Sequence, residues 1–154
     1  MSLEEKIAQC LINGKKTLSL AESCTGGRLA DLLTNVSGSS KFFKLGVIVY
    51  SNEAKVRLLK IRPVILKKHG AVSEQVAQLM ARQVRRLQKT DFGIAITGIA
   101  GPTGGTSVKP VGLTYIAVAA KEKTLCLKYV FPGNRSQVKT QAARRALKML
   151  FQFL

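Results

Sequence analysis

Short apolar runs alternate with longer amphipathic stretches along the chain. Runs at residues 17–21, 45–50 and 92–97 are too short for helices and rich in aliphatic side chains, which is typical of buried strands. Two further runs, at residues 111–120 and 124–131, are separated only by a Lys-Glu-Lys turn. This short turn predicts that the last two runs form an antiparallel hairpin.

The stretches between these runs carry apolar residues at the spacing of amphipathic helices. Capping-box patterns begin the first and the last of them, at Ser2 with Glu5 and at Asn134 with Gln137. The predicted helices cover residues 3–14, 25–34, 52–60, 63–69, 73–89 and 135–150.

The order of these elements predicts the fold class. Strands alternate with helices through the first three strands, which is typical of α/β proteins with both faces of the sheet covered, and the hairpin adds antiparallel pairing. We therefore predict a three-layer α/β/α sandwich with a mixed, mostly parallel sheet. The chain contains no linker, repeat or low-complexity tract, so we expect one domain over residues 1–154.

The strong positive charge adds a question about partners. Twenty-five Lys and Arg against eight Asp and Glu give a formal net charge of +17, which suits nucleic acid or an anionic small molecule. The basic residues are scattered without a run of five, aromatic residues make up 6% and tryptophan is absent. This diffuse pattern makes nucleic acid the weaker expectation.

Composition also limits the kinds of site and of location. The three cysteines (Cys10, Cys24 and Cys126) form no C-x-x-C pair and His69 is the only histidine, which argues against a disulfide framework or a metal site. No apolar run approaches the roughly 18 residues of a membrane span, and the N-terminus lacks the pattern of a secretory signal. We therefore expect a cytoplasmic protein without membrane association.

Unusual polar residues follow each of the three buried runs. The loops read ESCTGG at residues 22–27, YSNEAK at residues 50–55 and TGIAGPTGGT at residues 97–106. Ligands of open α/β sheets bind beyond the carboxyl ends of the strands. The sequence therefore predicts that these three loops face one crevice.

Ser23 is the candidate nucleophile in the first loop, since a serine beside the free N–H groups of a helix start suits acyl transfer. Its alternative role is to cap the helix. Lys55 is the candidate general base, which requires a neutral amine and hence a pKa lowered from about 10.4 by burial or positive charge. Its alternative is a solvated surface lysine. Tyr50 is a candidate to relay a proton or hold the lysine, or else a strand-end tyrosine with its hydroxyl at the surface.

Cys24 is the alternative nucleophile, because a helix start lowers the pKa of a thiol. We rank it below Ser23, because His69 lies in a distant segment and is more typical of a helix-end cap than of a catalytic base.

Other polar residues are candidates for binding. Glu22 can anchor its loop or contact a substrate hydroxyl, and Arg135 can form a bidentate contact with a phosphate or carboxylate. The glycines of residues 98–105 allow a phosphate to approach the backbone, although the loop matches neither common nucleotide-binding motif.

Together these segments resemble the C-terminal domain of the CinA (competence/damage-inducible) family, whose stand-alone members are nicotinamide-nucleotide amidases of the PncC type. The resemblance covers roughly residues 5–150 and is carried by AESCTGG, YSNEAK, HGAVSEQVAQLMA, TGIAGPTGGT and FPGNRSQV, in this order. It implies hydrolysis of nicotinamide mononucleotide to nicotinic acid mononucleotide and ammonia, without a metal or an organic cofactor.

The resemblance also implies roles for residues. It makes Ser23 the nucleophile, with Tyr50 and Lys55 assisting, and it places substrate contacts in the loop of residues 97–106 and at Arg135. With the candidates above, the expected substrate-binding residues are Glu22, Thr25, Gly26, Thr97, Gly98, Gly101 and Arg135. A homo-oligomer, for example a dimer, is expected for a compact domain of this size.

Two other functions stay open from the sequence. One is a basic, non-enzymatic domain that binds nucleic acid in connection with competence or DNA damage. The other is a ligand-binding or regulatory domain with a degenerate site, although the presence of Ser23, Tyr50, Lys55 and Arg135 argues against degeneracy.

Overall fold

The computed structural model describes all 154 residues, which build one five-stranded sheet. Its strands are β1 (Leu18–Glu22), β2 (Phe43–Ile48), β3 (Phe92–Gly98), β4 (Leu113–Ala119) and β5 (Thr124–Val130), in the spatial order β2-β1-β3-β4-β5. β1 pairs in parallel with β2 and β3, whereas β4 pairs antiparallel with β3 and β5. Two antiparallel steps return β5 to the direction of β3, so only β4 runs against the others. The predicted mixed, mostly parallel sheet is confirmed.

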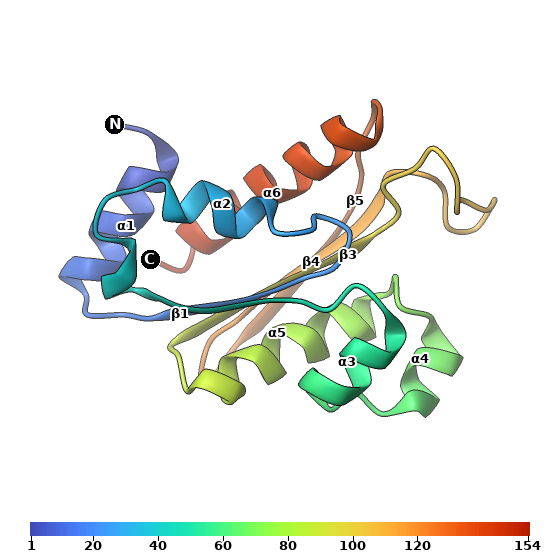
Figure 1. The fold of residues 1–154 in the computed structure, drawn as a ribbon, viewed down its shortest axis with the longest axis horizontal. Coiled ribbons are helices and arrows are strands. Elements are labelled where there is room, and N and C mark those ends of the chain that lie inside the picture. The colour runs from blue at the N-terminus through green and yellow to red at the C-terminus, as the bar shows by residue number, and fades with distance from the viewer.

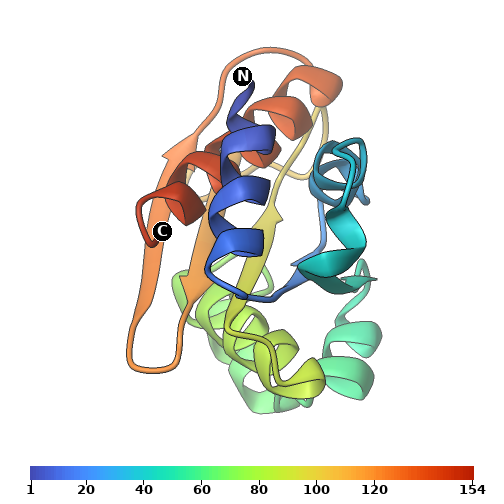
Figure 2. The ribbon, with the colours of Figure 1, turned by 90° about the vertical axis from the view of Figure 1, so that its left-hand side faces the viewer.

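Helices cover both faces of this sheet (Figure 1). One face carries α1 (Leu3–Asn13), α2 (Arg28–Thr34) and α6 (Arg135–Phe151). The other carries α3 (Asn52–Leu59), α4 (Pro63–His69) and α5 (Glu74–Gln88), and a 3-10 turn, η1 (Ser39–Lys41), precedes β2. The predicted three-layer sandwich is confirmed, and Figure 2 shows the two helical layers on either side of the strands. No helix combines the length and the apolar character needed to cross a membrane.

Side chains of β3 show how the sheet builds two cores. Ile94 and Ile96 face the layer of α1, α2 and α6, whereas Ala95 faces α5. The face toward α5 is lined by small residues, and a Cβ atom at Gly93 would collide with the Ala81 carbonyl oxygen of that helix. The missing side chain therefore sets how closely α5 packs on the sheet, and fully burying an aliphatic side chain of either core contributes about 1.5–3 kcal/mol.

Both predicted capping boxes are present. The Ser2 hydroxyl accepts from the Glu5 amide at 3.1 Å while the Glu5 carboxylate accepts from the Ser2 amide at 2.7 Å. Asn134 and Gln137 make the same reciprocal pair at 2.9 and 2.8 Å before α6. These bonds satisfy amide groups that a helix start otherwise leaves unpaired, and the second box fixes the position of Arg135, the first residue of α6.

Two predicted elements differ from the structure. The run at residues 45–50 is not a buried strand, because β2 lies at an edge of the sheet and its side chains alternate between partly buried and exposed. The helix predicted over residues 25–34 begins only at Arg28, because Gly26 and Gly27 form a turn with φ of 60° and 105°. Such positive φ angles suit glycine, which has no Cβ atom.

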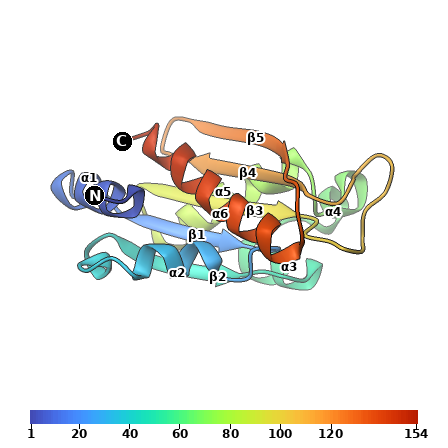
Figure 3. The same ribbon diagram turned by 90° about the horizontal axis from the view of Figure 1, so that it is seen from above.

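The long loop of residues 99–112 projects from one end of the molecule, beyond the carboxyl ends of β1 and β3. Both chain termini lie toward the opposite end (Figure 3).

Candidate active site

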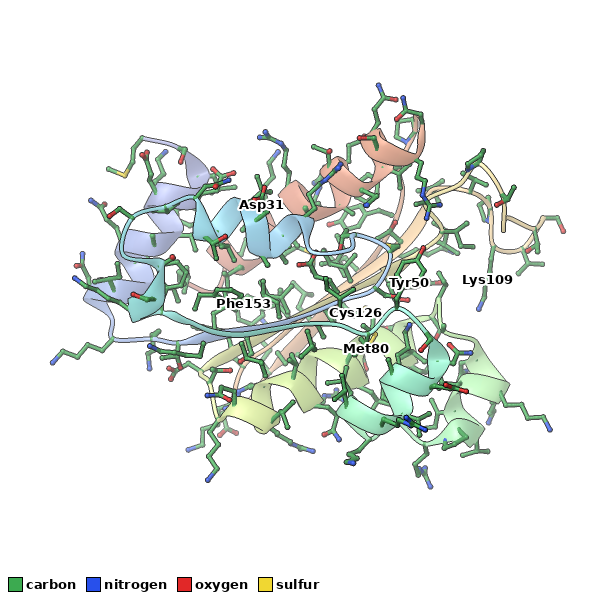
Figure 4. All side chains as sticks on the ribbon, in the orientation of Figure 1. Asp31, Tyr50, Met80, Lys109, Cys126 and Phe153 are labelled. Atoms are coloured by element: carbon green, nitrogen blue, oxygen red, sulfur yellow. The ribbon has the colours of Figure 1, made fainter.

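The three predicted loops meet in one cleft at the carboxyl ends of β1 and β3. The cleft has a volume of about 270 Å³, and the labelled Tyr50 lies at this end of the molecule, between the two helical layers (Figure 4). The residues that line it are Ser23, Cys24, Tyr50, Lys55, Ala71, Val72, Thr97, Gly98, Ile99, Ala100, Gly101, Thr103, Gly104 and Arg135.

Lys55 is the centre of a buried hydrogen-bond cluster. The Ser51 hydroxyl caps α3 by accepting from the Ala54 amide at 3.0 Å, so the helix begins close behind β2 and Lys55 falls in its first turn. The Lys55 Nζ lies 2.9 Å from Ser23 Oγ and donates to the carbonyl oxygens of Val49 and Tyr50 at 2.8 and 3.2 Å. Lys55 is only 1% exposed, so the alternative of a solvated surface lysine is excluded.

Burial lowers the pKa of Lys55 below the ordinary value of 10.5. A buried ammonium loses its hydration, which favours the neutral amine unless an anion compensates. No carboxylate pairs with Lys55, since the one ion pair of the structure joins Lys16 and Asp91. Burial therefore shifts Lys55 in the direction that a general base requires.

Ser23 does not cap the following helix. The cap residue of α2 is Gly27, which offers no side chain, and the carboxylate of Glu22 takes over this task. Its Oε1 accepts from the Leu29 amide and its Oε2 from the Ala30 amide, both at 3.0 Å. A carboxylate at a helix N-terminus is favourable, and this arrangement leaves the Ser23 hydroxyl free for the cleft.

Glu22 and Thr25 hold the serine loop from inside the protein. The Thr25 hydroxyl donates to Glu22 Oε1 at 2.6 Å. Both residues are buried, with Thr25 1% and Glu22 2% exposed. Neither lines the cleft, so the structure gives them an anchoring position. Gly26 is exposed and does not line the cleft either, and its amide donates to the Ser23 carbonyl oxygen at 3.2 Å. The amides of Cys24 and Thr25 donate to no other residue and remain available beside Ser23.

The alternative nucleophile is disfavoured by its environment. Burial raises the pKa of the Cys24 thiol to about 11, contrary to the lowering predicted for a helix start, so the thiol is protonated at neutral pH. His69 does not line the cleft and instead ends α4, where its carbonyl oxygen accepts from Lys109 Nζ at 2.7 Å. No base therefore accompanies Cys24 other than the lysine that contacts Ser23.

Tyr50 and Arg135 lie at the mouth of the cleft. Tyr50 is 59% exposed, and its hydroxyl accepts from Arg135 Nη2 at 3.0 Å. Arg135 Nη1 donates to the Gly101 carbonyl oxygen at 2.6 Å, so one guanidinium connects the loops after β2 and β3. Tyr50 holds Lys55 through its backbone carbonyl rather than through its hydroxyl.

The loop after β3 supplies the opposite wall. The buried Thr97 hydroxyl donates to the Ala71 carbonyl oxygen at 2.9 Å, which joins this wall to the segment after α4. A Cβ atom at Gly98 would come within 2.8 Å of the Leu113 carbonyl oxygen and 3.1 Å of Cys24 Sγ. Only glycine therefore fits between β4 and the serine loop.

Lys139 is a residue near the site that the sequence motifs did not indicate. It lies one turn after Arg135 on α6, partly buried, and its Nζ approaches to 3.4 Å of the position that a Cβ atom on Gly26 would occupy. Its charge also acts on Cys24, whose pKa it lowers against the larger effect of burial. The spacing of four residues on a helix is the one signal that places it beside Arg135.

Fold and site together define a three-layer α/β protein with a buried serine–lysine pair at the carboxyl ends of its parallel strands. The CinA C-terminal domain model matches residues 1–154, and the chain belongs to this family.

Relatives of known sequence agree with this assignment. A CinA-like protein of Syntrophus aciditrophicus (strain SB) is 52% identical over 154 residues, covering 99% of this chain and 37% of the relative. A CinA-like protein of Koribacter versatilis (strain Ellin345) is 49% identical over 149 residues, covering 97% of this chain and 36% of the relative. The chain thus spans little more than a third of the length of these relatives.

Solved structures share the fold. A competence-damaged protein (CinA) superfamily protein from Escherichia coli has a TM-score of 0.95 at 36% identity, covering 99% of this chain and 88% of that one. A competence/damage inducible protein from Agrobacterium tumefaciens has a TM-score of 0.92 at 35% identity, covering 99% and 96%.

Proposed function

We propose that this domain is an amidase that hydrolyses nicotinamide mononucleotide to nicotinic acid mononucleotide and ammonia, with Ser23 as the nucleophile. The observation that carries the proposal is the 2.9 Å contact between Ser23 Oγ and the buried amine of Lys55. The choice of substrate rests on the resemblance of the AESCTGG, YSNEAK and TGIAGPTGGT segments to amidases of the PncC type.

The surroundings of Lys55 suit proton abstraction from Ser23. A neutral amine has two N–H donors and one lone pair. The carbonyl oxygens of Val49 and Tyr50 accept the two N–H groups, so the lone pair is directed to the third neighbour, the Ser23 hydroxyl. Two backbone contacts thereby orient the base, which reduces the reorganisation needed for the reaction.

The reaction then follows in two stages. Lys55 takes the Ser23 proton as Oγ attacks the carboxamide carbon, and the free amides of Cys24 and Thr25 stabilise the oxyanion. The carbon–nitrogen bond breaks as Lys55 returns the proton to the leaving nitrogen, which departs as ammonia. Lys55 next takes a proton from a water molecule that attacks the acyl-enzyme. As the ester bond breaks, Lys55 gives this proton to Ser23 Oγ, so the acid is released and the serine and the neutral amine are restored.

Cationic groups at the mouth suit the phosphate of the substrate. The guanidinium of Arg135 is held in place by Tyr50 and Gly101, and a planar guanidinium matches two phosphate oxygens. Lys139 adds a second positive charge from the next turn of α6. The net charge of +17 also raises the local concentration of an anionic substrate.

Ammonia release from nicotinamide mononucleotide tests the proposal. We expect Ser23→Ala and Lys55→Met each to reduce kcat by about a thousandfold or more, because the nucleophile or its base is lost. Cys24→Ala and Ser40→Ala should retain activity, the latter as a matched serine variant at an exposed position outside the cleft. Activity that survives Ser23→Ala overturns the nucleophile, and a wild-type protein without activity on this nucleotide overturns the substrate.

A further inference from the structure

A second hollow, of about 210 Å³, lies at the end of the sheet opposite to Ser23. It is formed between the last turns of α5 and the turn that joins β4 to β5, the end of the molecule at which the chain termini lie (Figure 3). The residues that line it are Arg82, Arg85, Arg86, Ala119, Ala120, Lys121, Glu122, Lys123 and Thr124. We refer to it as the hairpin hollow.

Two arginines of the hairpin hollow are held by neutral acceptors. Arg82 Nε donates to the Thr124 hydroxyl at 3.1 Å, and Arg85 Nε donates to the Asp91 carbonyl oxygen at 3.0 Å. Both side chains are partly buried. Each guanidinium is therefore fixed through its Nε, while both of its Nη groups stay free and its charge is not neutralised.

The free Nη groups are not needed as hydrogen-bond donors to the last carbonyl groups of α5. The carbonyl oxygens of Arg85 and Arg86 already accept from the backbone amides of Thr90 and Lys89, at 3.1 and 3.2 Å. Capping of the last turn, a common role for arginines at this place, is thus performed by the main chain.

The surroundings of the hairpin hollow remain strongly positive. Arg86 and Lys121 add two charges, whereas Lys123 is directed toward the ring of Phe153, with its Nζ 5.5 Å from the ring centre. Glu122 is the one acidic residue of the lining and forms no ion pair with these cations, because the single ion pair of the structure joins Lys16 and Asp91 elsewhere. Unpaired, partly desolvated positive charge is a condition that a bound anion relieves.

We propose that the hairpin hollow binds a small anion with adjacent phosphoryl groups, of the diphosphate type. Guanidinium groups donate in pairs to phosphate oxygens, and two of them with free Nη groups stand at Arg82 and Arg85, one helical turn apart. The volume of about 210 Å³ suits a compact anion of this kind. This inference does not depend on the amidase proposal, because the two sites lie at opposite ends of the sheet.

Calorimetric titration with sodium pyrophosphate, at fixed ionic strength, tests the proposal on the full chain. We expect saturable binding of one pyrophosphate per chain. The double variant Arg82→Gln/Arg85→Gln should bind about tenfold more weakly or worse, because two charge-assisted contacts are lost. Arg144→Gln/Lys148→Gln is the matched control, since it removes the same charge from exposed positions of α6 and should bind as the wild type does.

Further arms keep the test decisive. Arg82→Lys preserves the positive charge and removes the planar guanidinium that donates in pairs. This variant should fold normally and still bind pyrophosphate more weakly. It replaces the double variant if the double variant does not fold. The proposal is overturned if Arg144→Gln/Lys148→Gln weakens pyrophosphate binding as much as Arg82→Gln/Arg85→Gln does. It is also overturned if the wild type shows no saturable binding of pyrophosphate. The phosphoryl group can also come from a nucleic-acid backbone. If single-stranded oligothymidylate displaces pyrophosphate and its affinity falls steeply with salt, the proposal of a small free anion is overturned.

Discussion

Replacing Lys55 by methionine should change how the stability of the fold depends on pH. The lysine side chain is 1% exposed and has no anionic partner, so the folded protein favours its neutral form and the pKa of Lys55 is lowered. In the unfolded chain the same amine titrates near 10.4. Between these two pKa values the unfolded state therefore binds one more proton than the folded state.

The sign and size of the effect follow from proton linkage. Because the unfolded state binds more protons, the free energy of unfolding rises with pH in this interval, by about 1.4 kcal/mol per pH unit for one group. Below the folded pKa and above the unfolded pKa this contribution is flat. Near the upper end, Lys55→Met should be less stable than the wild type by about 1–3 kcal/mol, because the buried Val49 carbonyl oxygen loses its donor. Its deficit should shrink as the pH falls.

Urea denaturation from about pH 6 to about pH 10 measures this slope. Burial also raises the pKa of Cys24 to about 11 and that of Cys126 to about 12, so both thiols oppose stability as the pH rises. The wild type and Lys55→Met both retain the two thiols. Subtracting their free energies of unfolding at each pH therefore largely removes the effect of the thiols. Lys68→Met, at an exposed position of α4, is the control and should run parallel to the wild type. Parallel curves for Lys55→Met would refute the lowered pKa.

Three further substitutions test other parts of the fold and site. Glu22→Gln should destabilise the protein by about 2 kcal/mol in chemical denaturation, because the carboxylate accepts three hydrogen bonds around the start of α2. A stability equal to that of Glu53→Gln, at an exposed position, would contradict this role. Gly93→Ala should lower the free energy of unfolding by about 1–3 kcal/mol or more, since its Cβ atom would collide with the Ala81 carbonyl oxygen. An unchanged melting temperature would show that α5 can shift freely. Arg135→Lys should raise KM for the proposed substrate, nicotinamide mononucleotide, about tenfold with a smaller change in kcat, because the proposed two-pronged contact with its phosphate is lost. A loss confined to kcat would contradict a binding role.

Much of the fold was predictable because its signals are local. Capping boxes at Ser2 and Asn134, and the short turn between β4 and β5, fix element ends within a few residues. The exposure of β2 was not predictable, because an aliphatic run reads alike at an edge and in the centre of a sheet. The spatial order β2-β1-β3-β4-β5 decides that question, and contacts between distant segments determine this order.

The site was predictable to the extent that it follows the ends of strands. Ser23, Lys55 and Arg135 all line the cleft expected for them. The task of Glu22 was less evident, because its partners lie seven and eight residues ahead and depend on the turn at Gly27. The spacing of four residues from Arg135 was the one local signal for Lys139, and the packing of α6 against the serine loop brings its amine close to Gly26.

The position of the two chain ends has a practical meaning. Met1 is 72% exposed and Leu154 is 40% exposed, and both lie toward the end of the molecule away from the loop of residues 99–112. An affinity tag, a solid support or a further domain joined at either end would leave the mouth of the Ser23 cleft unobstructed. An attachment at Leu154 would stand near the hairpin hollow, because the centre of the neighbouring Phe153 ring lies 5.5 Å from Lys123 Nζ. The chain start lies in the helical layer opposite to α5 (Figure 2), so a tag at the N-terminus suits assays of the second site.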